Sequence, residues 1–155
     1  MHITILSVGA LNKKSPEYEM VDLYVDRFQK TGRHIGLRSL SLMSVDSGPD
    51  KDSEATRLLA KIPANTSVIR LDEHGKSFSS VAFATKIESL KDRGTDRLWF
   101  LIGGAAGCGE AVRTAIPETM AFGPQTWPHR LVKVMLAEQL YRAASLLSGG
   151  PYHKA

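Results

Sequence analysis

The chain has 155 residues, of which 43% are hydrophobic and 23% charged, and its formal net charge is +4. These values are ordinary for one globular domain with its own core, and no apolar run approaches the roughly 20 residues that a membrane-spanning helix needs. The first residues lack the basic segment of a secretory signal, and the single cysteine excludes an internal disulfide framework, so we expect a cytoplasmic protein with one domain over residues 1–155.

The first half of the chain alternates strand-like and helix-like segments. Residues 2–8 form an apolar run that predicts a buried strand. Ser15 as N-cap and Pro16 at the first helical position predict a helix over residues 16–30, where apolar residues recur at helical spacing. The same alternation continues with a strand at 37–45, a helix at 53–62 before Pro63, and a strand at 67–71.

The second half repeats this alternation. We expect a helix from Ser79 or Ser80 to Gly94, a strand at 97–102, a helix at 109–116, a strand at 118–122 and a long helix at 129–148. Strands that alternate with helices predict an α/β fold, with a mostly parallel sheet covered by helices on both faces. Ligands of such sheets bind beyond the C-terminal strand ends, where we expect Leu71, Gly103 and Phe122.

Two irregular loops follow predicted strands of the second half, at residues 103–107 and 122–129. Their glycines and prolines allow backbone amides and carbonyls to reach a ligand. The first loop lacks both the Gly-Lys-Ser/Thr of a phosphate loop and the spacing of a dinucleotide fingerprint. Alone it is equally well explained as a tight turn, but beside the second loop it favours a small-molecule pocket.

The C-terminal segment is basic. From His129 onward, one acidic residue is set against four basic ones: Arg130, Lys133, Arg142 and Lys154. Tyr152 and His153 add a ring that stacks on a nucleobase and an imidazole, which favours an RNA partner. A solvated basic helix face remains the alternative on charge alone, and Arg142 has an alternative role in a surface pair with Glu138.

The remaining reactive residues have plainer interpretations. No Cys/His cluster has metal-ligand spacing, so we expect no metal, and no hydrolase elbow is present. We expect Cys108 to be a buried packing residue, and Asp72 and Glu73 to have no catalytic role. His129 has the position of a structural residue. Trp127 is compatible with either a cofactor contact or core packing.

Four strings occur in order along the chain and end near its last residue: Gly103-Gly104-Ala105-Ala106-Gly107, Thr126-Trp127-Pro128-His129, Ala137-Glu138-Gln139-Leu140-Tyr141-Arg142-Ala143 and Pro151-Tyr152-His153-Lys154. On these strings the chain resembles the RlmH family of bacterial ribosomal RNA methyltransferases, in the SPOUT (α/β-knot) superfamily. The total length, Gly9 after the first strand and the Leu71-Asp72-x-x-Gly75-Lys76 segment agree with this resemblance.

The resemblance implies a fold and a reaction. It implies a SPOUT domain with a C-terminal trefoil knot, which general topology rules would argue against. It also implies transfer of a methyl group from S-adenosyl-L-methionine to ring nitrogen N3 of a pseudouridine in 23S rRNA, with the large subunit of the assembled ribosome as substrate. It further implies a homodimer in which one subunit's tail approaches the other's cofactor, without membrane or metal.

The resemblance also assigns residues. The positions matching the cofactor site are Leu71, Gly103, Phe122, Gly123, Pro124, Gln125, Thr126 and Trp127. The expected catalytic residues are His153 for proton handling, Arg142 for charge stabilisation and Tyr152 for positioning the base, because the imide nitrogen must lose its proton to attack. Lys154 and Arg130 are expected to contact RNA. The alternatives are a non-catalytic ribosome- or RNA-binding protein and a nucleotide-dependent oxidoreductase.

Overall fold

The alternation of strands and helices builds one parallel sheet. The computed structural model describes residues 1–153, in which five strands have the spatial order β2-β1-β4-β3-β5. The strands are β1 (His2–Val8), β2 (Ser39–Val45), β3 (Ser67–Ser77), β4 (Arg97–Ile102) and β5 (Thr119–Ala121). Every paired neighbour is parallel, as the sequence predicts.

Side-chain caps decide where several helices begin. The helices are α1 (Pro16–Gly32), α2 (Lys51–Lys61), α3 (Ser80–Asp92), α4 (Glu110–Ala115) and α5 (His129–Leu147), with a 3-10 turn η1 at Arg33–Ile35. Ser15 and Ser79 each accept a backbone N–H of the following turn, as expected of N-caps. Asp50 caps α2 in the same way, so this helix begins two residues earlier than predicted.

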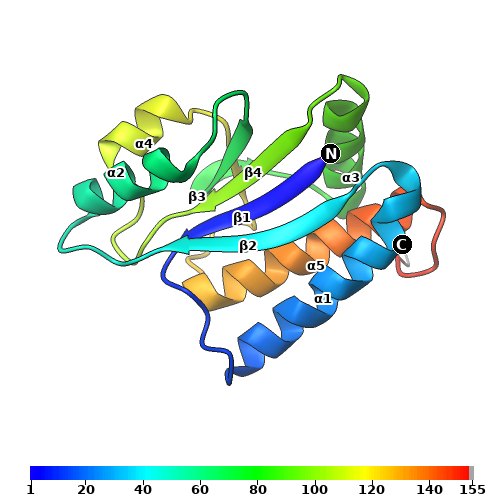
Figure 1. The fold of residues 1–155 in the computed structure, drawn as a ribbon, viewed down its shortest axis with the longest axis horizontal. Coiled ribbons are helices and arrows are strands. Elements are labelled where there is room, and N and C mark those ends of the chain that lie inside the picture. Colours follow the sequence, from blue (N-terminus) through cyan, green and yellow to red (C-terminus); the bar gives the residue numbers. More distant parts are fainter. Residues whose placement is uncertain (154–155) are drawn as a thin grey trace.

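The two faces of the sheet carry separate hydrophobic clusters. In β4 the side chains of Leu98 and Phe100 join one cluster, whereas Trp99 and Leu101 join the other, as the two-residue period of a strand requires. The first cluster contains the buried apolar residues of α1, α3 and α5, and the second contains those of α2 and α4. Figure 1 shows α1 and α5 side by side under the sheet, with α2 and α4 on the opposite face. The predicted α/β fold with helices on both faces is therefore confirmed.

Strand β3 continues past its predicted end. Its pairing with β5 breaks after Leu71 and resumes at Lys76, so the four residues 72–75 bulge out of the ladder. Gly75 passes so close to β5 that an added Cβ would lie 2.7 Å from the backbone carbonyl carbon of Met120. Leu71 thus stands at an interruption of β3, and its predicted place at the strand's end was wrong.

No helix within residues 1–153 is long and apolar enough to cross a membrane.

Candidate functional site

Three chain segments meet at the C-terminal edge of the sheet and enclose a cavity of ≈ 660 Å³, which we call the loop pocket. They are residues 70–74 around the β3 bulge, residues 102–108 after β4, and the loop between β5 and α5. The lining includes seven of the eight predicted cofactor residues: Leu71, Gly103, Phe122, Gly123, Gln125, Thr126 and Trp127. Pro124 belongs to the same loop but does not line the cavity.

The first loop is shaped by its glycines. The amide of Gly107 donates to the carbonyl of Gly104 at 2.9 Å, and Gly107 has a left-handed backbone with φ of +80°. A Cβ on Gly103 would lie 2.7 Å from Sγ of Cys108. Glycine is therefore required at Gly103 for close packing and at Gly107 for backbone conformation. The loop is a tight turn and also a wall of the pocket, so the two interpretations of this sequence are compatible.

The second loop is tied down at two points. The Thr126 hydroxyl donates to Oε2 of Glu73 at 2.7 Å, which joins the loop to the β3 bulge. Nε1 of Trp127 donates to the carbonyl oxygen of Phe122 at 3.1 Å and closes the loop on itself. Trp127 is 38% exposed, so of its two sequence interpretations core packing is wrong. Its indole is instead a half-open wall of the loop pocket.

A partly buried ion pair lines the loop pocket. The Arg70 guanidinium donates to Asp72, and its Nε donates to the carbonyl of Ile116 at 3.3 Å. Burial opposes ionisation of Asp72, but the backbone N–H of His74 and the Arg70 guanidinium together hold the pKa of this carboxyl below its usual value. Sequence analysis missed Arg70. The signal was a charged residue inside the apolar run of β3, two positions before an acid.

Cys108 also lines the loop pocket, but its thiol packs in the second hydrophobic cluster. Burial raises the pKa of this thiol, so it stays protonated and unreactive near neutral pH. This agrees with its expected packing role. His129 lines the same pocket at the first position of α5.

The tail folds back onto its own helix. The ring centroids of Tyr152 and Tyr141 are 4.5 Å apart, and Cζ of Arg142 lies 4.7 Å from the Tyr152 ring centroid. Nη1 of Arg142 is 3.5 Å from Nδ1 of His153. Burial, together with Tyr24 and Glu138, raises the pKa of Tyr152 far above its usual value, so its phenol stays neutral. Lys154 lies outside the described residues.

Within one chain the tail does not reach the loop pocket. The pocket adjoins the first turn of α5 at His129 and Val132, whereas Arg142 lies near its other end. At about 1.5 Å per residue, His129 and Arg142 are about 20 Å apart along the helix axis. Arg130 is exposed at the pocket end of α5. The structure therefore assembles the predicted cofactor residues in one place and the predicted catalytic residues in another.

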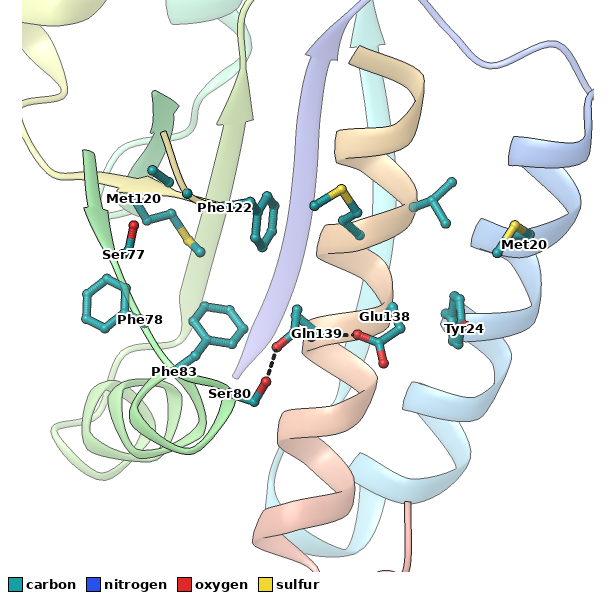
Figure 2. A pocket seen from close by; sticks show the side chains of 14 residues that line it. Met20, Tyr24, Ser77, Phe78, Ser80, Phe83, Met120, Phe122, Glu138 and Gln139 are labelled. Carbon is teal, nitrogen blue, oxygen red and sulfur yellow. Dashed lines mark hydrogen bonds between the residues drawn. The ribbon is translucent and has the colours of Figure 1, made fainter. Parts of the chain in front are cut away.

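A second cavity, of ≈ 530 Å³, lies between these two places; we call it the helix pocket. Figure 2 shows Tyr24 of α1 facing Glu138 of α5, while Gln139 points away from α1 toward Ser80 of α3. Phe83 of α3 and Phe122 lie on the same side of α5 as Ser80. Its lining shares residues 120–123 with the loop pocket. Sequence analysis missed this cavity, because its walls come from five elements that lie far apart in the chain: α1, β3, α3, β5 and α5.

Among residues 1–153, no three His, Cys, Asp or Glu side chains are grouped so that they hold a metal ion.

Known proteins match the chain over its full length. A family model described as "Predicted SPOUT methyltransferase" matches residues 1–153. A protein of Hyphomonas neptunium named ribosomal RNA large subunit methyltransferase H is 48% identical over 155 residues, covering all of both chains. Proteins of the same name from Phenylobacterium zucineum and Caulobacter vibrioides are 47% and 44% identical over 99% of both chains.

A more distant solved structure is the SpoU methyltransferase AviRb from Streptomyces viridochromogenes in complex with AdoMet. It aligns with a TM-score of 0.41 and 14% identity, covering 92% of this chain and 59% of the other.

Proposed function

We propose, from the premise that this chain belongs to the SPOUT methyltransferase family, that it transfers a methyl group from S-adenosyl-L-methionine to 23S ribosomal RNA. The target is N3 of a pseudouridine in the large subunit of the assembled ribosome. The enzyme works in the cytoplasm as one SPOUT domain with a C-terminal trefoil knot, as the resemblance implies. The full-length relatives, all named for this RNA class, support the proposal.

The loop pocket is the proposed cofactor site, and its geometry is the observation that carries the proposal. Its volume is within the range of about 300–1,000 Å³ typical of small-molecule sites. The glycine turn at Gly103 offers main-chain groups without obstruction, while Leu71 and Trp127 offer apolar surface for the faces of an adenine ring. These residues, with the loop at 122–127, suit a nucleoside held by backbone hydrogen bonds.

The proposed chemistry is a direct displacement. Bound S-adenosyl-L-methionine supplies an activated methyl group, so the protein must chiefly orient the attacking nitrogen and favour its deprotonated form. Arg142 keeps its charge at every working pH, because Glu138 raises its pKa further, and it stabilises the anionic ring. Tyr152 is a neutral phenol that positions the base, and His153 takes the proton.

The proposed RNA contacts are two basic residues, Arg130 and Lys154. Arg130 is exposed at the first turn, beside the loop pocket. Lys154 follows the tail residues in the sequence but lies outside the described part of the chain. We propose that both contact phosphates, since neutralised phosphates supply much of the affinity of RNA-binding proteins.

The proposed enzyme is a homodimer with a shared site. The separation of about 20 Å between His129 and Arg142 is too long for one chain to bring its own tail to its own cofactor in this conformation. Exposed apolar side chains on α1 and α5 offer a surface for a second copy: Met20, Leu23 and Leu131. A partner tail entering beside the loop pocket would complete the site.

The central experiment measures transfer of labelled methyl groups to ribosomes that lack the modification, followed by mapping of the modified nucleotide. We expect one pseudouridine of 23S rRNA to be labelled. Calorimetry with S-adenosyl-L-methionine tests the pocket independently. His153→Ala should abolish most transfer and leave cofactor affinity nearly intact.

Two results would contradict the proposal. Absence of cofactor binding, with ribosome binding retained, would favour the alternative of a non-catalytic ribosome-binding protein. Unchanged turnover of His153→Ala would remove this residue from the mechanism.

A further inference from the structure

Four polar side chains form a continuous chain of hydrogen bonds from Ser80 of α3 to Arg142 of α5, which contacts the tail. The Ser80 hydroxyl donates to Oε1 of Gln139 at 2.8 Å. Nε2 of Gln139 donates to Oε2 of Glu138 at 2.7 Å, and Oε1 of Glu138 accepts from Nε of Arg142 at 3.0 Å. Figure 2 shows the first two of these contacts crossing the helix pocket.

The two middle members of this chain, Gln139 and Glu138, are each held on two sides. The Gln139 amide accepts with its oxygen and donates with its nitrogen, so its orientation is set by Ser80 and Glu138 together. Both oxygens of Glu138 are engaged, one by Gln139 and the other by two nitrogens of Arg142. A carboxylate constrained in this way has little freedom to rotate, and it presents a fixed edge to the guanidinium.

The Arg142 fork divides its two edges between two partners. Nε and Nη2 face Glu138, which leaves Nη1 toward the imidazole of His153. The plane of the same guanidinium lies over the Tyr152 ring. Rotation of the Arg142 head would therefore displace both tail residues.

We propose that Glu138 and Gln139 are positioning residues, which orient Arg142 and through it His153 and Tyr152 for methyl transfer. This rests on the proposed function of Arg142 and the tail. Ser80 holds the α3 end of the chain of hydrogen bonds. The orientation of the catalytic groups therefore depends on the contact between Ser80 and Gln139, which are 59 positions apart. Misplacement of reacting groups by about 1 Å costs up to a hundredfold in rate, which gives this anchoring a measurable role.

A plain surface pair is the competing explanation. Glu138 and Arg142 are four residues apart on a helix, and exposed pairs of this kind contribute little to stability. The Glu138 and Arg142 side chains are only 17% and 23% exposed, however, and Gln139 holds Glu138 from the other side. The pair between Asp26 and Lys30 on α1 has the same spacing, with side chains 54% and 73% exposed, and serves as a matched control.

The test compares Glu138→Gln with Asp26→Asn, both of which remove one carboxylate charge from an i,i+4 pair. We expect Glu138→Gln to lower kcat on ribosomes by about tenfold to a hundredfold. Its KM and Kd for S-adenosyl-L-methionine should remain near those of the wild type, because Glu138 does not line the loop pocket. Asp26→Asn should leave kcat unchanged.

Two substitutions at Ser80 test the other end of this chain of hydrogen bonds. Ser80→Ala removes the hydroxyl that orients Gln139 and should lower kcat, while Ser80→Thr keeps the hydroxyl and should restore it. This pair decides the question if Glu138→Gln fails to fold, which circular dichroism would reveal. Equal kcat for Ser80→Ala and wild type would overturn the proposal, as would full activity of a folded Glu138→Gln.

Failure of the proposed function gives a different result. If the wild type neither binds the cofactor nor methylates ribosomes, both the function and the positioning role are wrong. If the wild type is active and both Glu138→Gln and Ser80→Ala have the same kcat as the wild type, only the positioning role is wrong.

Discussion

At the scale of single residues, a charged side chain that is buried needs a neighbour of opposite charge. Arg70 is the clearest example, because its side chain is 9% exposed and its nearest anion is Asp72. A buried guanidinium without an anion is strongly unfavourable, whereas a paired one is tolerated. Ionisation of Asp72 is therefore tied to the stability of the loop-pocket wall.

Asp72→Asn should lower the free energy of unfolding at neutral pH by about 2–3 kcal/mol. The folded pKa of Asp72 lies below its unfolded value, so the stabilisation is complete above pH about 4 and is lost as the pH falls through the folded pKa. The difference in the free energy of unfolding between wild type and Asp72→Asn should thus become smaller in acid. Urea titrations at several pH values measure this difference. A difference that does not change with pH would contradict the assignment to this ion pair.

An irregularity in strand β3 positions part of the proposed site. The β3 bulge delivers residues 72–74 to the loop pocket, and Gly75 lets the strand return against Met120. The glycine at 75 has an ordinary φ, so its requirement is steric only. Any side chain there would force β3 away from β5.

Gly75→Ala should therefore weaken S-adenosyl-L-methionine binding as well as stability, because its Cβ would meet the Met120 backbone at 2.7 Å. The matched control is Gly94→Ala after α3, where the added Cβ meets no atom but the φ of +86° is unfavourable for alanine. We expect the control to lose about 1 kcal/mol of stability and to keep cofactor affinity. Thermal melting and calorimetry separate the two effects; equal cofactor affinities would contradict a role for the bulge.

At the scale of the whole molecule, the two ends of α5 hold complementary halves of the proposed site. The loop pocket adjoins its first turn, and Arg142 with the tail lies near its last. In the proposed homodimer, two copies related by symmetry would each bring a tail to the partner's loop pocket.

Mixed dimers test this arrangement. Trp127→Ala damages the loop pocket and His153→Ala damages the tail, so each variant alone should have little activity. Co-refolded mixtures should recover about a quarter of wild-type activity, because random pairing gives half heterodimers with one intact site each. No recovery, or a monomer in sedimentation at working concentration, would show that the subunits do not share the site.

The local sequence determined much of this protein. Strand and helix periods, the caps at Ser15 and Ser79 and the glycine turn near Gly103 depend on neighbouring residues, so the fold class and most element bounds were predictable. Family membership, predicted from four strings in order, is confirmed by the full-length matches. The assigned roles of the site residues stay predictions.

Only the tertiary structure decided which of these residues meet. The return of β3 past Gly75, the burial of Arg70 and the contact from Ser80 to Gln139 join residues distant in sequence. Periodicity reports which face of an element is apolar, but not which partner packs there. Such contacts depend on how the elements pack around a common core, and local propensity does not contain that information.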